Sequence, residues 1–545
     1  MQHHPTRSIV PTFWWLIVCM IALLFVASIA SAQAPERATG PMGFDEARHL
    51  LNRTSFAAQT AEIEDYAKLT RAEAVDRLLA ETRRQAAYPA PAWTAKYERV
   101  FRPDMTQEER MKANRRELVE RGLELRTWWV AEMLSTPTPL TEKMTLFWHN
   151  HFATSQQKVR VGNLMYRQNV MLRRYALGNF AAMLREVSKD PAMLVYLDGA
   201  QNRKGAPNEN FAREVMELFT LGEGHYSEQD IKEVARAFTG WSIDPELGEF
   251  RFRRAIHDDG SKTILGSSGK FNGDDVVTLL LQQPATGEFI VGKLWREFVS
   301  PEPDTAAVKQ LAATWRAANY EIKPLMRAML LSSAFWAPEN RGTLVKSPVD
   351  LVIGSLRQFR FSVEDPAPFA VILRQLGQDL FGPPNVKGWP VGDAWLNTTT
   401  LLARKGFLNR LFRADEMVRA DMNANTKAEV VVQPTAQLTA QLMDRDMMGE
   451  RRQRAQMRLA ARGEVALAGG GVNVDNLPPF GVSNQLRGQY FFSADQWFAL
   501  QPPSMNNERV WHTVLAGPPV QATPELPRTL AGLRTLALDP MYQLK

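Results

Sequence analysis

The sequence predicts an all-α protein, a large multi-helix single domain that carries a small β-hairpin insertion. Apolar residues recur at helical spacing between residues 106 and 134, and again in successive segments up to about residue 418. Residues three and four apart line one face of a helix, so this recurrence indicates helices that bury one side. The chain is 45% hydrophobic and 23% charged over 545 residues, which is ordinary for a globular protein.

The first 34 residues have the pattern of a secretory signal peptide. Arg7 gives a positive start, residues 13–30 are apolar, and residues 32–34 (AQA) fit a small-x-small cleavage site. We therefore predict cleavage after residue 34 and a periplasmic or secreted protein. The alternative is an uncleaved membrane anchor, because the apolar run is near the length that spans a bilayer. After cleavage we expect no membrane span.

Charge and cysteine usage exclude some classes of function. The only cysteine, Cys19, lies inside the apolar run, so the mature chain has no disulfide, thiolate metal site or cysteine nucleophile. The net charge is +6 and the pI is about 9.3, but no basic run is interleaved with aromatic residues. We therefore expect no nucleic-acid binding, and a mild basic excess suits an anionic neighbourhood.

Local signals mark the elements along the middle of the chain. A helical pattern covers residues 141–152, and the capping-box sequence SEQD at 227–230 leads into a helix that Gly240 ends. Residues 249–266 differ, because two short stretches with apolar residues flank a polar turn at 257–260. This spacing predicts the small β-hairpin.

Composition divides the chain into four parts. The signal peptide (1–34) is followed by the helical domain, predicted over residues 35–420. Residues 421–525 are glycine-, methionine- and glutamine-rich, and we interpret them as an irregular insertion or linker-rich region. Residues 526–545 contain proline-bounded sequence for one short helix, which we expect to close the domain.

Residues 207–222 (PNENFAREVMELFTLG) predict one helix with a clear start and end. Asn208 suits the cap at its start, and Gly222 suits a left-handed residue after its end. The apolar residues at helical spacing form a buried stripe, made of Phe211, Val215, Leu218 and Phe219.

Three ionisable residues stand beside that stripe. Arg213 and Glu217 are four apart, so they can pair along the helix, while Glu214 and Glu217 project from neighbouring positions. This arrangement suits either a buried ion network or a metal site, and the residues alone leave both open.

The sequence FWHNHF at 147–152 carries two histidines on different helix faces, so they would not chelate one ion together. His151 is the better candidate for a metal ligand or proton carrier. The alternative is a structural imidazole that satisfies backbone carbonyls at the helix end or stacks on Trp148.

The turn at 257–262 gathers an imidazole, carboxylates and an ammonium. His257, Asp258 and Lys262 together suit acid/base catalysis, or they form a solvated hairpin tip. Trp389 and Trp395 flank loop glycines and are candidates for a surface stacking platform.

Several motifs occur in one order along the chain. They are FWHNHF at 147–152, the helix at 207–222, ARAFTGW at 235–241, His257-Asp258 with Lys262 and Leu265-Gly266, KSP at 346–348 and PPNVKGW at 383–389. Together they resemble the bacterial "domain of unknown function 1800" family over residues 42–415, with a closing segment at 526–545.

The resemblance implies an exported helical protein whose gene neighbours encode exported proteins that resemble sulfatases and phosphatases. It implies no particular activity. Family members often carry the Asn-His-Phe that this chain has at 150–152, and some carry a histidine where this chain has Phe219. A mechanism that relies on that histidine would fail here.

Two functions remain open from the sequence. The preferred one is an exported cell-envelope protein that binds or assembles with an exported phosphatase- or sulfatase-like partner. In it, the polar motif residues form a buried network that sets helix register; the network residues are Asn150, Asn210 and Arg213.

The alternative is a metal-assisted hydrolase. His151, Glu214 and Glu217 would hold a divalent metal between facing helices. The acid/base candidates are His151, His257, Asp258 and Lys262. Both ideas require ionisable groups from three separated segments to meet, and the sequence identifies no other cofactor.

Overall fold

The computed structural model describes residues 40–424, 490–502, 506–520 and 528–545. The predicted signal peptide and most of the predicted irregular region lie outside the described residues. Helices account for most of the described chain, and the described residues form three two-stranded sheets besides. The predicted all-α class is confirmed.

The elements of the first half of the described chain run as follows. They are α2 (Gly43–Thr54), α3 (Thr60–Tyr66), α4 (Arg71–Ala80), η1 (Ala92–Ala95), α5 (Gln107–Arg115), η2 (Arg116–Glu120), α6 (Arg121–Ser135), α7 (Pro139–His151), α8 (Gln156–Val159), α9 (Gly162–Tyr175), α10 (Phe180–Lys189), α11 (Pro191–Tyr196), η3 (Gly199–Gln201), α12 (Glu209–Glu217) and α13 (Glu228–Ala237). The helix expected over residues 106–134 is confirmed as α5 and α6, joined without a break by the π-helical turn η2.

The second half begins with the hairpins. Its elements are β1 (Trp241–Asp244), β2 (Glu249–Phe252), η4 (Arg254–Ile256), β3 (Lys262–Ile264), β4 (Ser267–Gly269), α14 (Gly273–Gln282), α15 (Pro284–Phe298), α16 (Thr305–Ala317), α17 (Ile322–Leu330), α18 (Ser333–Trp336), η5 (Pro338–Asn340), α19 (Pro348–Gln358), β5 (Ser362–Val363), α20 (Ala367–Gln375), η6 (Gly392–Trp395), α21 (Thr398–Ala424), β6 (Tyr490–Phe491), α23 (Ala494–Ala499), α24 (Asn507–Val514), α25 (Leu530–Leu538) and η8 (Pro540–Gln543).

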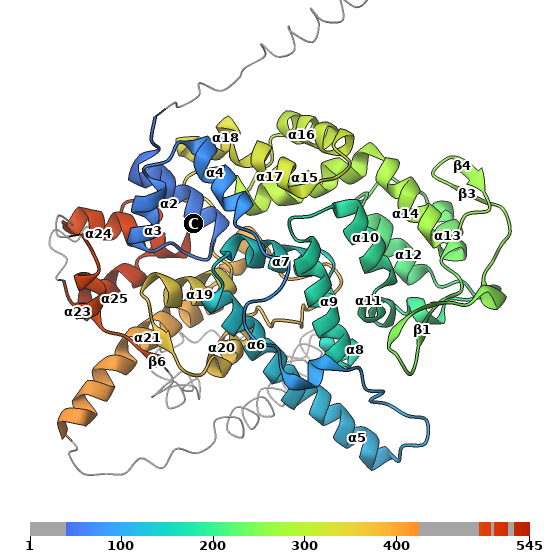
Figure 1. Cartoon of the computed structure of the whole chain (residues 1–545), viewed down its shortest axis with the longest axis horizontal. Coiled ribbons are helices and arrows are strands. Elements are labelled where there is room, and N and C mark those ends of the chain that lie inside the picture. Colours follow the sequence, from blue (N-terminus) through green and yellow to red (C-terminus); the bar gives the residue numbers. More distant parts are fainter. Residues whose placement is uncertain (1–39, 425–489, 503–505, 521–527) are drawn as a thin grey trace, which may run out of the picture.

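One apolar core connects these helices. Its buried members extend from Met42 in front of α2 to Tyr542 in η8, and Trp129, Trp148 and Trp295 are among its largest enclosed side chains. Figure 1 shows α7 near the middle of the molecule, with β1, β3 and β4 at one edge. The motif-bearing helix α7 therefore lies inside the bundle, whereas the hairpins are peripheral.

Two hairpins stand where the sequence predicted one. β1 pairs with β2 and β3 pairs with β4, both antiparallel. The predicted pairing of residues 250–253 with 263–265 is wrong, and the polar turn at 257–260 links the two hairpins instead. Each strand pair has a tight turn of its own: Leu265 and Gly266 have φ of 48° and 79°, the positive values that a two-residue hairpin turn requires.

The end of the described chain packs back onto the domain. β6 pairs with β5, and the Trp497 indole of α23 donates to the Gln358 carbonyl at 3.1 Å. The Lys346 and Lys545 amides donate to the Gln543 and Leu344 carbonyls at 2.8 and 2.7 Å. Part of the region predicted as irregular thus belongs to the fold, while the domain boundaries themselves remain predictions.

Candidate functional site

The predicted helix at 207–222 has the expected start and a shorter body. The Asn208 side chain accepts from the Asn210 amide as the cap of α12, and Gly222 has a φ of 79°. The helix ends at Glu217, and tighter turns continue to Gly222. Phe211 is 1% exposed, as expected for the predicted stripe.

His151, the last residue of α7, lies against the end of α12. Its Nε2 donates to the Phe219 carbonyl at 3.2 Å, and its Nδ1 therefore accepts from the Lys293 ammonium, also at 3.2 Å. Burial, followed by the nearby Lys293 charge, lowers the pKa of His151 well below its ordinary value. The imidazole is thus neutral with both nitrogens engaged, and its ring lies edge-on to Trp148.

Lys293 of α15 was not found by sequence reasoning, since it belongs to no motif. Its ammonium also donates to the Leu218 carbonyl at 3.3 Å and lies 4.5 Å from the Phe289 ring centre. A helix C-terminus carries partial negative charge, which stabilises a cation there. Burial, followed by Arg296, lowers the pKa of Lys293 to about 8.

Arg213 pairs with residues other than those predicted. Its guanidinium forms a bidentate pair with Glu228 at 2.8 and 2.9 Å and lies 3.7 Å from Glu209. The predicted pairing with Glu217 is wrong, because Glu217 accepts from the Tyr226 hydroxyl at 2.9 Å. With 36% of its side chain exposed, Arg213 is not part of a buried network.

Glu214 is half-buried, and among the described residues its carboxylate makes no hydrogen bond or ion pair. Burial, followed by the charge of Glu217, raises its pKa above the ordinary value. Within the described residues no group of three or more His, Cys, Asp or Glu side chains is arranged to hold a metal. His151, Glu214 and Glu217 are therefore not arranged as one ligand set among the described residues, since the lone pair of His151 already accepts from the Lys293 ammonium, and metal binding stays a prediction.

The two asparagines of the predicted network hold loops separately. The Asn150 side chain accepts from the Trp389 amide at 2.6 Å, and the Asn210 side chain donates to the Leu197 carbonyl at 3.2 Å. Trp389 and Trp395 are 3% and 5% exposed, so neither offers a stacking platform. Asn150 thus anchors the end of the PPNVKGW loop.

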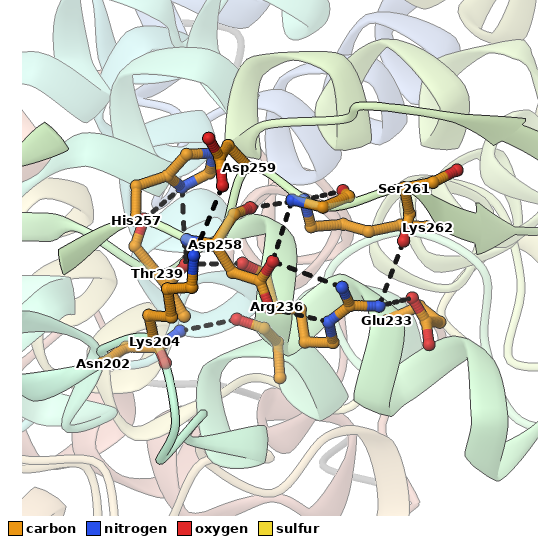
Figure 2. A network of polar contacts seen from close by, with 12 residues as sticks. Asn202, Lys204, Glu233, Arg236, Thr239, His257, Asp258, Asp259, Ser261 and Lys262 are labelled. Carbon is orange, nitrogen blue, oxygen red and sulfur yellow. Dashed lines mark hydrogen bonds and ion pairs between the residues drawn. The ribbon is translucent and has the colours of Figure 1, made fainter. Parts of the chain in front are cut away.

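The turn between the hairpins contains the other predicted catalytic residues (Figure 2). The His257 Nδ1 donates to the Thr239 carbonyl at 2.8 Å. Among the described residues its Nε2 makes no hydrogen bond. The ring is half-buried and lies 5.3 Å, edge to face, from Phe252.

Asp258 is held by Arg236 of α13. The guanidinium Nε and Nη2 donate to the carboxylate at 2.8 and 3.2 Å, while the Asp258 amide donates to the Thr239 hydroxyl at 2.7 Å. The hydrogen bond from Arg236 is the largest cause that lowers the pKa of Asp258 to about 2. Figure 2 shows Arg236 between Asp258 and Glu233, which accepts at 2.6 Å.

Lys262 is buried beneath this turn. Its ammonium donates to the Asp258 and Gly260 carbonyls at 2.5 and 2.9 Å, and burial lowers its pKa. Lys262 thus clamps the backbone between the hairpins. Arg236 and Thr239, which complete the network, lie in the ARAFTGW motif, so a signal existed although sequence reasoning gave them no role.

A second ionic cluster adjoins the KSP motif, because the Ser347 hydroxyl donates to Asp350 at 3.1 Å. The two Asp350 oxygens accept from the Lys143 and Lys545 ammonium groups, each at 2.7 Å, and Lys545 also donates to Glu297 at 3.0 Å. Burial alone would raise the pKa of Asp350, but Lys143 and Lys545 hold it below the ordinary value. Sequence reasoning missed this cluster, because its members are far apart along the chain.

The structure thus brings His257, Asp258 and Lys262 together in one turn. Among the described residues they form no common ligand set with the carboxylates of α12. The catalytic roles assigned to these three residues and to His151 remain predictions.

Comparison with known proteins bears on identity alone. No curated protein and no solved structure matches the chain. A family model, described as a protein of unknown function (DUF1800), matches residues 49–469, which begins later and ends later than the 42–415 expected from the motifs. The chain therefore belongs to the DUF1800 family.

Proposed function

We propose that this chain is an exported cell-envelope protein that binds or assembles with an exported partner, a phosphatase- or sulfatase-like protein. The observation that carries the proposal is the network at the hairpins. Arg236, Lys262 and Thr239 direct their polar groups at the backbone and the carboxylate of one turn. A network of this kind makes a peripheral surface rigid, and a rigid surface loses little entropy on binding.

Other polar residues are engaged in the same way. His151 and Lys293 satisfy carbonyls at the end of α12, and Asn150 holds the PPNVKGW loop. Three cavities in the described part of the chain, of about 490, 250 and 470 Å³, have none of these residues in their linings. Their chemistry therefore supports a scaffold rather than a substrate pocket.

The expected location is periplasmic or secreted, and it rests on the signal-peptide pattern at residues 1–34. Within the part of the chain that the structure describes, no helix is long and apolar enough to cross a membrane.

One observation favours the alternative, a metal-assisted hydrolase. Glu214 combines a raised pKa with a carboxylate that lacks a partner among the described residues, and such groups occur at acid/base sites. Elemental analysis of the purified protein tests it. Stoichiometric metal that is lost in Glu214→Gln would favour the hydrolase over the scaffold.

Co-purification from envelope extracts after mild crosslinking tests the preferred function. The affinity tag belongs directly after residue 34, because Lys545 at the other end is buried in the Asp350 cluster. We expect one stoichiometric partner, and we expect Arg236→Gln to reduce its recovery by releasing the hairpin turn.

Arg327→Gln is the matched control. It breaks another bidentate pair, Arg327 with Asp76 at 2.6 and 3.0 Å, on a different surface. Recovery that is equal in the two variants, or the absence of any stoichiometric partner with the wild-type protein, would overturn the proposed function.

A further inference from the structure

Three exposed arginines stand at the base of the first hairpin. Arg203, Arg253 and Arg254 lie on the surface, and among the described residues their guanidinium groups make no hydrogen bond, ion pair or ring contact. We call these three residues the arginine face. Guanidinium groups in a protein are always charged, so the face is cationic at any physiological pH.

Backbone contacts bring the three arginines together from two segments. The Gly240 amide donates to the Asn202 carbonyl at 3.0 Å, and the Arg253 amide donates to the Gly240 carbonyl at 2.7 Å. On the other side of Arg203, the Lys204 amide donates to the Ile256 carbonyl at 2.8 Å. Arg203 is therefore flanked by two links to the segment that carries Arg253 and Arg254.

The acidic groups of the adjoining turn are already engaged. Asp258 is held by Arg236, and Asp259 lies 3.4 Å from the Lys204 ammonium. Each carboxylate of the turn thus has a cationic partner other than the arginine face. Repulsion among clustered like charges is relieved when an anionic partner binds.

Two neighbouring features suit a polypeptide. Phe252 is 45% exposed and precedes Arg253, so an apolar contact adjoins the cations. β2 belongs to a sheet of two strands, and it pairs with no strand other than β1 among the described residues. An unpaired strand edge offers backbone groups to an extended chain.

We propose that the arginine face and the free edge of β2 dock an extended acidic segment of the partner protein. This inference rests on the proposed function and names the chemistry of its partner. Carboxylates accept two parallel hydrogen bonds from one guanidinium, and alternate side chains of an extended segment point to one side, towards the arginines.

Fluorescence anisotropy with the purified full chain tests the proposal. The probe is a fluorescein-labelled peptide of alternating glutamate and valine, and its neutral counterpart has glutamine in place of glutamate. We expect binding of the acidic peptide alone, weakening with added salt. The triple variant R203E/R253E/R254E should bind it at least about tenfold more weakly.

The matched control is K112E/R174E/K309E, which changes the same number of charges at exposed cations on α5, α9 and α16. It should bind the peptide like the wild type, and thermal melting should show that both variants are folded. If both variants bound the peptide equally weakly, net charge alone would explain the effect and the proposal would be overturned. Labelled dextran sulfate that binds more tightly than the peptide at equal charge would overturn it in favour of an anionic polymer.

Co-purification from envelope extracts with R203E/R253E/R254E distinguishes a failure of the docking site from a failure of the proposed function. A partner that is recovered equally by R203E/R253E/R254E overturns the docking site and leaves the proposed function standing. If the wild-type protein recovers no partner, the proposed function fails, whereas peptide binding by purified protein still decides whether the arginine face takes acidic chains.

Discussion

Two aspartates anchor polar clusters in different parts of this molecule, and they do so differently. Asp350 is 3% exposed and joins Lys143 of α7 to Lys545 at the end of the chain. Asp258 lies at the edge of the molecule and joins Arg236 of α13 to a turn 22 residues away. Both carboxylates have both oxygens engaged, but only the first joins segments that are distant in sequence.

The comparison separates a cluster that holds the fold from one that shapes a surface. A buried ion whose partner is removed keeps its desolvation penalty, whereas exposed ions return to water. The Asp350 cluster therefore matters to the whole domain. The Asp258 network matters to the local conformation on which the arginine face depends.

Asp350→Asn should have the largest effect, because it leaves Lys143 and Lys545 buried with one carboxylate fewer between them. We expect the free energy of unfolding to fall by about 3–5 kcal/mol, measured by urea denaturation. Replacing the two lysines by Met and Asp350 by Leu together should cost less than Asp350→Asn alone. If Asp350→Asn lowered the free energy of unfolding by less than the triple variant does, the comparison would be contradicted.

The pKa of Lys346, which is buried near Asp350, predicts how the stability of the protein depends on pH. Burial lowers its pKa from 10.5 to about 7, although the charge of Asp350 acts in the opposite direction. Between pH 7 and pH 10.5 the unfolded chain therefore binds one more proton at this lysine than the folded protein does. Stability contributed by this group therefore rises with pH across that window, by up to about 1.4 kcal/mol per pH unit. Lys346→Met should remove this slope in denaturation series, whereas the exposed Lys309→Met should retain it.

Arg236→Gln should have a smaller effect on stability, about 1 kcal/mol, because the pair with Asp258 is partly exposed. Its main result should be faster hydrogen exchange at residues 257–262, with exchange in α7 unchanged. Arg236→Lys keeps the charge without the two-pronged contact and should fall in between. Unchanged exchange in the turn would remove the physical basis of the rigid surface.

The sequence predicted what depends on local pattern. The helical class, the Asn208 cap and the positive φ of Gly222 follow from spacing and from residue type, and the structure has all three. The contacts of Asp350 were beyond such reasoning, since its partners lie 207 and 195 residues away. Nothing local distinguishes Lys143 from a surface lysine on an amphipathic helix.

The candidate site was predicted in part for a related reason. His257, Asp258 and Lys262 are close in sequence, so their convergence followed from one turn, although their partners Arg236 and Thr239 did not. Helical spacing predicted that Arg213 pairs with Glu217. It could not show that Glu228, beyond the following loop, would accept from Arg213 instead.

Arg213→Gln tests the smallest expected effect and sharpens the contrast with Arg236. Arg213 has the same bidentate geometry, with Glu228, but Glu228 is 70% exposed. Water and salt screen such a pair, so its loss is offset by solvation of both ions. We expect an unchanged denaturation midpoint and unchanged exchange in α12. A clear fall in the midpoint would mean that Arg213 stabilises the fold as the predicted buried network with Asn150 and Asn210 would, and that exposure is not what separates the two kinds of site.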